Sequence, residues 1–117
     1  METKSAITSL SALAHEGRLS AYRLLVQAGP DGLAAGDLAR RLDILPNTLS
    51  ASLNILSHAG LVESRRDGRS IIYTAQYDQM SELLAFLMED CCSGSPEICG
   101  PLVKVASRTC AAAAPSC

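Results

Sequence analysis

Aromatic side chains are scarce in this chain, and tryptophan is absent. Three tyrosines and one phenylalanine make up 3% of the 117 residues. Proteins that hold single-stranded nucleic acid stack its bases on aromatic side chains, so this activity is disfavoured. A run of about 18 uncharged apolar residues is also missing, and we therefore expect no transmembrane helix and no membrane partner. Positive charge is not in excess, since 10 basic and 12 acidic residues give a formal net charge of −2.

Cysteine is absent from the first 90 residues and frequent in the last 27. The five cysteines are Cys91, Cys92, Cys99, Cys110 and Cys117. The N-terminus lacks the apolar stretch and cleavage site of a secretory signal, so we expect a cytoplasmic location. Thiols are mostly reduced there, and clustered cysteines bind metals or sense redox state more often than they form structural disulfides. The odd number of cysteines also fits a disulfide framework poorly.

The chain has enough apolar material for one packed domain. Its 117 residues allow a single domain, and 48% of them are apolar. Charge is uneven, because residues 15–73 carry a net charge of +1 and residues 74–117 a net charge of −3. After Cys92, serine, glycine and proline interrupt any regular element. We therefore expect a folded domain over residues 1–92 and a flexible, cysteine-containing tail over residues 93–117.

The spacing of apolar residues predicts five helices and a β-hairpin. Helical spacing predicts helices over about residues 4–14, 16–28, 33–42, 46–60 and 76–90. Alternating residues predict strands over residues 61–65 and 70–74, joined by a turn at residues 66–69 that contains Asp-Gly. The order α-α-α-α-β-β-α is that of a winged helix-turn-helix, a mainly α fold with a small β-hairpin (α+β). In this fold, the second helix of the pair lies in the major groove of DNA.

Four segments of the chain carry a family pattern when they are read in order. They are Ala12–Leu19, Asp37–Ala39, Thr48–Leu53 and Ala59–Tyr73. With these segments, residues 5–92 resemble the ArsR/SmtB family of metalloregulatory repressors. The resemblance implies a homodimer that forms through the first and fifth helices. It also implies a repressor that binds operator DNA and leaves it when an inducer binds.

The inducer site needs a separate argument, because this family places such sites in several locations. One family site uses a Leu-Cys-Val-Cys-Asp-Leu run on the third helix, but the matching run, Leu33–Leu38, has no cysteine. Another uses Asp and His ligands on the fifth helix, and residues 76–90 contain Asp78 but no histidine. Cys91 and Cys92, with Cys99 nearby, resemble the vicinal cysteine pair of the arsenic-responsive family members.

The chemistry of these thiols favours trivalent arsenic as the inducer. Soft thiolate ligands select thiophilic ions, and trivalent arsenic and antimony take three sulfurs. The negative end of a helix, together with Glu89 and Asp90, disfavours the thiolate form of Cys91 and Cys92. Zinc must displace the thiol protons, whereas arsenite carries a hydroxide for each proton and releases water. An organoarsenical needs only two sulfurs, and antimony(III) also fits.

Other readings of the cysteines stay open. The protein could instead sense cadmium, lead or zinc, or it could be a repressor with a thiol redox switch. Cys110 and Cys117 could replace Cys99 as a ligand, or they could be tail thiols without a role. Because Cys91 and Cys92 have acidic neighbours and no base nearby, we expect neither enzymatic activity nor a catalytic cofactor.

DNA-contacting residues are expected on the polar face of the fourth helix and on the hairpin. Those on the helix, whose side chains can touch bases or phosphates, are Asn47, Thr48, Ser50, Ser52 and Asn54. Those on the hairpin are Arg65, Arg66 and Arg69. They would contact phosphates or the minor groove, or they form only a solvated tip of the hairpin. At the end of the third helix, two more arginines either meet phosphate or face solvent, namely Arg40 and Arg41. The two histidines are His15 and His58, and both fit capping or surface positions better than metal-ligand positions.

Overall fold

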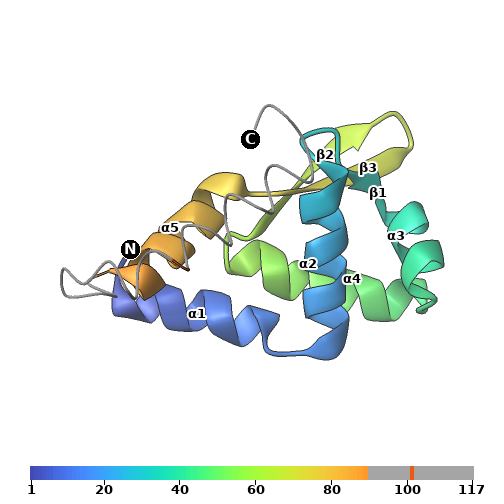
Figure 1. Cartoon of the computed structure of the whole chain (residues 1–117). Helices are drawn as coiled ribbons and strands as arrows, with labels where there is room; N and C mark the ends of the chain where they lie inside the picture. Colours follow the sequence, from blue (N-terminus) through green and yellow to red (C-terminus); the bar gives the residue numbers. More distant parts are fainter. Residues whose placement is uncertain (90–100, 102–117) are drawn as a thin grey trace. The chain divides into compact units, whose positions relative to one another are not determined.

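The computed structural model describes residues 1–89 and 101, and the described part contains five helices and three strands (Figure 1). In chain order these are α1 (Thr3–Leu13), α2 (Glu16–Ala28), β1 (Leu33–Ala34), α3 (Ala35–Leu42), α4 (Pro46–His58), β2 (Val62–Asp67), β3 (Ser70–Ala75) and α5 (Tyr77–Met88). This is the predicted winged helix-turn-helix with one added strand. The chain divides into two units, Met1–Phe86 and Leu87–Cys117, and the first unit contains the fold described below except for the last two residues of α5. Apart from residue 101, the predicted tail over residues 93–117 lies outside the described residues.

Side chains cap the junction between α1 and α2. His15 Nδ1 accepts hydrogen bonds from the backbone N–H groups of Gly17 (3.1 Å) and Arg18 (3.4 Å), which have no partner inside the first turn of α2. Arg18 in turn donates from Nε to the carbonyl oxygen of Ala12 (2.6 Å) and from Nη2 to that of Ser11 (3.3 Å) at the end of α1. The capping role predicted for His15 is confirmed, and the two helices are fixed at a sharp corner.

The strand β1 replaces the predicted first turn of the third helix. Leu33 pairs with Tyr73, and Ala34 pairs with Ile72, so that β1 extends an antiparallel sheet of order β1-β3-β2. Gly32 permits this approach, because it has a φ of 73° and a Cβ at this position would collide with the carbonyl oxygen of Tyr73. The prediction of a helix from residue 33 is therefore wrong by two residues, since pairing with β3 takes up this segment.

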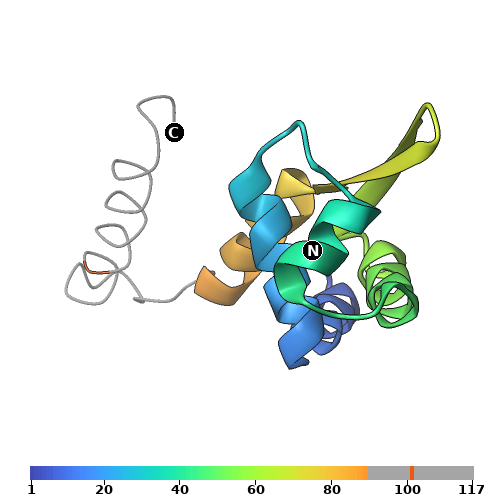
Figure 2. The same ribbon diagram turned by 90° about the vertical axis from the view of Figure 1, so that its right-hand side faces the viewer.

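The β2–β3 hairpin is longer than predicted and has a tighter turn. The register pairs Asp67 with Ser70, so the loop consists of Gly68 and Arg69 alone. Gly68 has a positive φ of 63°, which the first position of a two-residue hairpin turn of type I′ or II′ requires and which glycine adopts without strain. Arg66 and Asp67, predicted to lie in the turn, belong to β2. Figure 2 shows the hairpin projecting away from the helices, as a wing does.

The core forms where α2, α3 and α4 meet the base of the wing. Its leucines, each at most 1% exposed, are Leu25, Leu38, Leu49, Leu53, Leu56 and Leu61. The start of α5 is tied to the same body, because Tyr77 Oη donates to the carbonyl oxygen of Val26 (3.0 Å) and Gln79 Nε2 donates to Ser9 Oγ (3.3 Å). None of the helices in this part of the chain is both long and apolar enough to cross a bilayer.

Candidate nucleic-acid interface

The turn between α3 and α4 orients α4 by backbone hydrogen bonds and one special residue. Asp43 adopts the left-handed conformation, with a φ of 54°, and its N–H donates to the carbonyl oxygen of Arg40 (3.3 Å). The N–H of Ile44 donates to the carbonyl oxygen of Ala39 (3.1 Å), which ends α3. Pro46 then begins α4 at a position where its missing N–H costs nothing. Together these bonds define a helix-turn-helix.

The outward face of α4 is mostly polar and carries no Lys or Arg, and its one large apolar side chain, Ile55, is 43% exposed. Four of its predicted contact residues are exposed, namely Asn47, Thr48, Ser50 and Asn54. On the opposite side, Leu49, Leu53 and Leu56 are buried in the core. This face is therefore free to enter a groove and to offer neutral hydrogen-bonding groups.

Ser52 does not belong to this face. Its exposed fraction is 7%, because it lies three residues after Leu49 and four before Leu56, and positions with this spacing share one side of a helix. The prediction that Ser52 lies on the polar face is therefore wrong. The sequence alone favoured it because serine is polar, but its angular position on α4 puts it beside the buried leucines.

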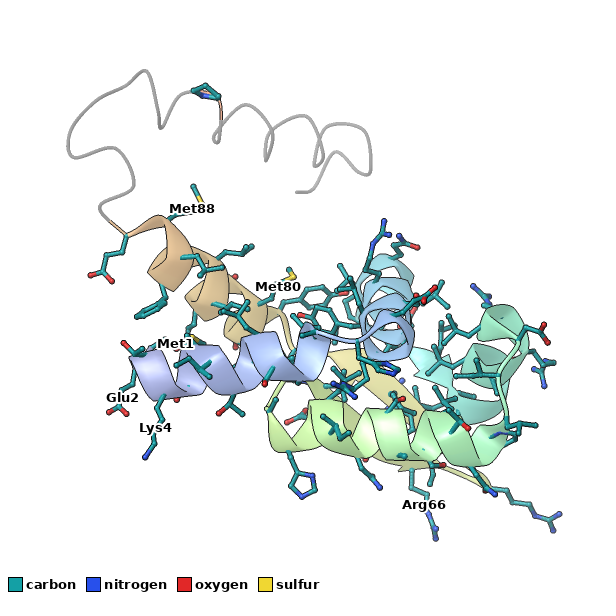
Figure 3. All side chains as sticks on the ribbon, turned by 90° about the horizontal axis from the view of Figure 1, so that it is seen from below. Met1, Glu2, Lys4, Arg66, Met80 and Met88 are labelled. Atoms are coloured by element: carbon teal, nitrogen blue, oxygen red, sulfur yellow. The ribbon has the colours of Figure 1, made fainter. Side chains whose placement is uncertain are left out.

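The three arginines of the wing differ in what they contact. Arg65 Nη2 donates to the carbonyl oxygen of Asp31, in the loop before β1, at 2.9 Å. Arg66 and Arg69 are exposed, and their guanidinium groups make no hydrogen bond or ion pair with any residue of the described part; Figure 3 shows Arg66 pointing outward from the helices. Successive residues of a strand point to opposite faces, so Arg65 and Arg66 lie on different sides of the hairpin. Sequence reasoning placed all three together.

The two arginines at the end of α3 also differ. Arg40 forms an ion pair with Asp37, one turn earlier on the same helix, and its side chain remains 74% exposed. Arg41 is exposed and has no carboxylate partner among residues 1–89. Arg41, Arg66 and Arg69 are thus the described cations of this region that are free to meet phosphate.

This geometry agrees with the relatives of the chain. A family model described as a helix-turn-helix domain matches residues 13–65. The biofilm growth-associated repressor of Agrobacterium fabrum is 34% identical over 84 residues, which cover 72% of this chain and 69% of the repressor. A solved structure of an ArsR-like transcriptional regulator from a Rhodococcus species matches with a TM-score of 0.66 and 26% identity, over 88% of this chain and 93% of that one. The chain belongs to the ArsR-like family of helix-turn-helix transcriptional regulators.

Further relatives of this ArsR-like regulator carry different names. The transcriptional activator HlyU of Vibrio cholerae is 30% identical over 89 residues, 74% of this chain and 80% of HlyU. The structure of reduced HlyU matches with a TM-score of 0.59 and 32% identity, over 73% of this chain and 90% of that one. A candidate arsenical resistance operon repressor, ArsR, of Halobacterium salinarum is 42% identical over 60 residues, 51% of this chain and 46% of that protein.

One solved relative of this ArsR-like chain is a dimer. It is the homodimeric winged helix-turn-helix DNA-binding domain of a possible ArsR-family regulator from Mycobacterium bovis. The TM-score is 0.61 and the identity 28%, over 73% of this chain and 77% of that one. In the present chain, Ile7 and Leu10 on α1 are 60% and 42% exposed, and Leu84 on α5 is 49% exposed. These apolar side chains lie on the two helices expected at the dimer interface.

The predicted sensor residues of the ArsR-like chain, Cys91, Cys92 and Cys99, lie outside the described residues. Within residues 1–89 and 101, no group of three or more His, Cys, Asp or Glu side chains could hold a metal ion. His58 occupies the predicted surface position, with Nδ1 2.7 Å from the carbonyl oxygen of Asn54.

A buried hydroxyl in the core escaped sequence reasoning. Tyr22 Oη has no hydrogen-bond partner in the described part of the chain, although the residue is only 5% exposed. Burial, and secondarily the nearby phenol of Tyr77, raise the pKa of Tyr22 above its usual value of 10.0. A tyrosine in a helical apolar pattern gives no sign of whether its hydroxyl finds a partner.

Proposed function

We propose that this ArsR-like regulator is a dimeric repressor that binds operator DNA and is released by trivalent arsenic or antimony. The observation that supports DNA binding best is the arrangement of α4, which exposes a mostly polar face and packs against α3 and β2, while the free cations Arg41, Arg66 and Arg69 lie on α3 and on the wing. Such a helix can enter the major groove while the arginines neutralise phosphates on either side of it. The Agrobacterium relative, named as a repressor, supports the direction of regulation.

Dimerisation would follow from the exposed apolar residues of α1 and α5. Ile7, Leu10 and Leu84 lose contact with water if a second copy covers them, and each buried leucine or isoleucine contributes about 1.5–3 kcal/mol when it is fully buried. A two-fold dimer presents two copies of α4, which must lie roughly 34–36 Å apart to reach half-sites one DNA turn apart. Operator binding is therefore sensitive to any change at the dimer helices.

The sensor we propose consists of Cys91, Cys92 and Cys99. The first two lie three and four residues after Met88, the last residue of α5, so an ion that binds there acts close in the chain to a helix of the proposed dimer interface. Each thiol exchanges its proton for a bond to arsenic, and each displaced hydroxide leaves with that proton as water. The candidate Halobacterium ArsR supports arsenic among the thiophilic ions. Coupling between ligand and DNA of about 1–3 kcal/mol corresponds to roughly 5- to 150-fold weaker operator binding.

A DNA-binding titration with sensor variants tests this proposal. A duplex selected from a random library by the wild-type protein serves as operator, and fluorescence anisotropy reports binding with and without arsenite. We expect arsenite to release the wild type and the control Cys117→Ser, but not the double variant Cys91→Ser, Cys92→Ser. Release of the double variant by arsenite would contradict the proposed site. Release by cadmium, lead or zinc, but not by arsenite, would identify the other class of inducer.

A thiol redox switch is the second candidate function. Reduced HlyU is among the solved relatives, and five cysteines within 27 residues supply thiols that could pair. In such a switch, two thiols give two electrons and two protons to a peroxide, which becomes two waters while a disulfide forms. If stoichiometric peroxide releases the duplex and arsenite does not, this function replaces the arsenic sensor. If only arsenite releases it, the redox switch is excluded.

A further inference from the structure

Three residues form a straight row along the outward face of α4. Asn47, Ala51 and Asn54 are spaced i, i+4 and i+7, and all three are exposed. The side-chain amides of Asn47 and Asn54 make no hydrogen bond with any described residue, and His58 Nδ1 contacts the backbone carbonyl of Asn54 rather than its amide. The row therefore presents two free amides with a methyl group between them.

The chemistry of this row discriminates between base pairs in the major groove. Guanine presents two acceptors, N7 and O6, which two donors from an arginine or lysine satisfy, and α4 contains neither residue. Adenine presents an acceptor at N7 and a donor at N6, and the carboxamide of asparagine supplies the matching donor and acceptor. The C5 methyl group of thymine fits against an apolar side chain such as that of alanine.

We propose that Asn47 and Asn54 each bind an adenine, and that Ala51 contacts the methyl group of a thymine between them. This specificity rests on the DNA binding proposed above. The two asparagines are seven residues apart, or about 10.5 Å along the helix axis, at about 1.5 Å per residue. For a helix axis that runs parallel to the DNA axis, that distance corresponds to roughly three base-pair steps of about 3.4 Å. Each operator half-site should therefore hold two adenines about three steps apart, with a thymine methyl group between them.

Nucleotide analogues in the selected duplex test the proposal atom by atom. 7-Deaza-adenine lacks N7, and uracil lacks the methyl group of thymine. At the two adenine positions, we expect 7-deaza-adenine to weaken binding of the wild type by about 5- to 100-fold. Asn47→Ala and Asn54→Ala should each become insensitive to the analogue at one position and remain sensitive at the other. Ala51→Gly should lose the discrimination between thymine and uracil at the central position.

Two further variants separate specificity from general binding. Ser57→Ala, which changes an exposed residue of α4 outside the row, is the matched control and should keep every analogue effect. Asn54→Arg should change the preferred pair at its position from A·T to G·C, because arginine supplies the two donors that guanine needs. Together they show whether the row itself sets the sequence preference.

The outcomes distinguish this proposal from the one on which it rests. If no duplex is enriched by the wild type, the proposed function fails, and the base assignment fails with it. If duplexes are enriched but carry G·C pairs at these positions, DNA binding stands and the base assignment is overturned. Analogue penalties that remain unchanged in Asn47→Ala and Asn54→Ala would also overturn the assignment.

Discussion

Arg65→Ala and Arg66→Ala are expected to weaken operator binding in different ways, although the two residues are adjacent in β2. Arg65 crosses β3 to donate to the carbonyl oxygen of Asp31 at 2.9 Å, whereas the guanidinium of Arg66 has no partner in the described part of the chain. Arg65 therefore positions the wing, and Arg66 is free to bind a phosphate. A variant that loosens the wing and one that removes a cation should be separable by their dependence on salt.

The magnitudes follow from the two kinds of interaction. An exposed hydrogen bond contributes about 1 kcal/mol, so Arg65→Ala should weaken operator binding by about fivefold at every salt concentration. Loss of one phosphate contact lowers the slope of log K against log salt by about 0.9. Between 50 and 200 mM salt, the penalty of Arg66→Ala should therefore shrink by about 3.5-fold. Arg65→Lys, which keeps the charge but not the planar guanidinium, should resemble Arg65→Ala.

Fluorescence anisotropy at several potassium chloride concentrations measures both slopes. Amide hydrogen exchange on the DNA-free protein provides the second readout, because Arg65→Ala should reduce protection of the β2–β3 amides and Arg66→Ala should not. The reasoning is refuted if Arg65→Ala lowers the salt slope as much as Arg66→Ala does, or if Arg65→Lys restores wild-type binding. Either result would make Arg65 a phosphate contact.

Three further substitutions test the core, the sheet and the DNA-facing side of α4. Tyr22→Phe removes a buried hydroxyl without a partner and should raise the free energy of unfolding by roughly 1 kcal/mol in urea denaturation at pH 7. Because the pKa of Tyr22 is raised in the folded state, the wild type should lose stability as the pH rises above about 10. Tyr22→Phe should lose less stability over the same range. Equal losses would show that Tyr22 does not cause the loss at high pH. Gly32→Ala places a Cβ against Tyr73 and should lower the free energy of unfolding by about 2 kcal/mol or more in the same assay. An unchanged free energy of unfolding would contradict the tight approach of β1 to β3. Ser52→Ala should leave the dissociation constant for the operator within about twofold, and a larger loss would return Ser52 to the DNA-facing set.

The helices could be predicted from sequence because each buries one side of a regular period. Leu49, Leu53 and Leu56 recur at helical spacing, and this pattern alone places α4. The strand β1 could not be predicted, because two residues carry no period and their pairing depends on β3, about 40 residues later. The bond from Arg65 to a backbone carbonyl has no sequence signal at all, since every residue offers a carbonyl. Ser52 was placed on the DNA-facing side because serine is polar, although its angular position on α4 puts it beside the buried leucines.

The proposed sensor was predicted on different grounds from the DNA-binding surface. Its residues, Cys91, Cys92 and Cys99, were selected by thiol chemistry and by resemblance to arsenic-responsive proteins, and both arguments act on residue identity. Identity selects the ligand class, but the geometry around an ion depends on how the chain brings the sulfurs together. The site therefore stays a prediction, and the cysteine variants described above are its test.

The absence of Lys and Arg from α4 has a consequence for how the protein finds its operator. In the proposed DNA complex, attraction to any duplex would come from Arg41, Arg66 and Arg69, which lie outside α4, and this attraction would fall steeply with salt. The preference for one sequence would come from the neutral groups that we propose on α4. Raising the ionic strength should therefore shorten the time spent sliding on random DNA, while the ratio of operator affinity to random-DNA affinity changes little. The speed of the search and the accuracy of the final choice would then depend on separate sets of residues.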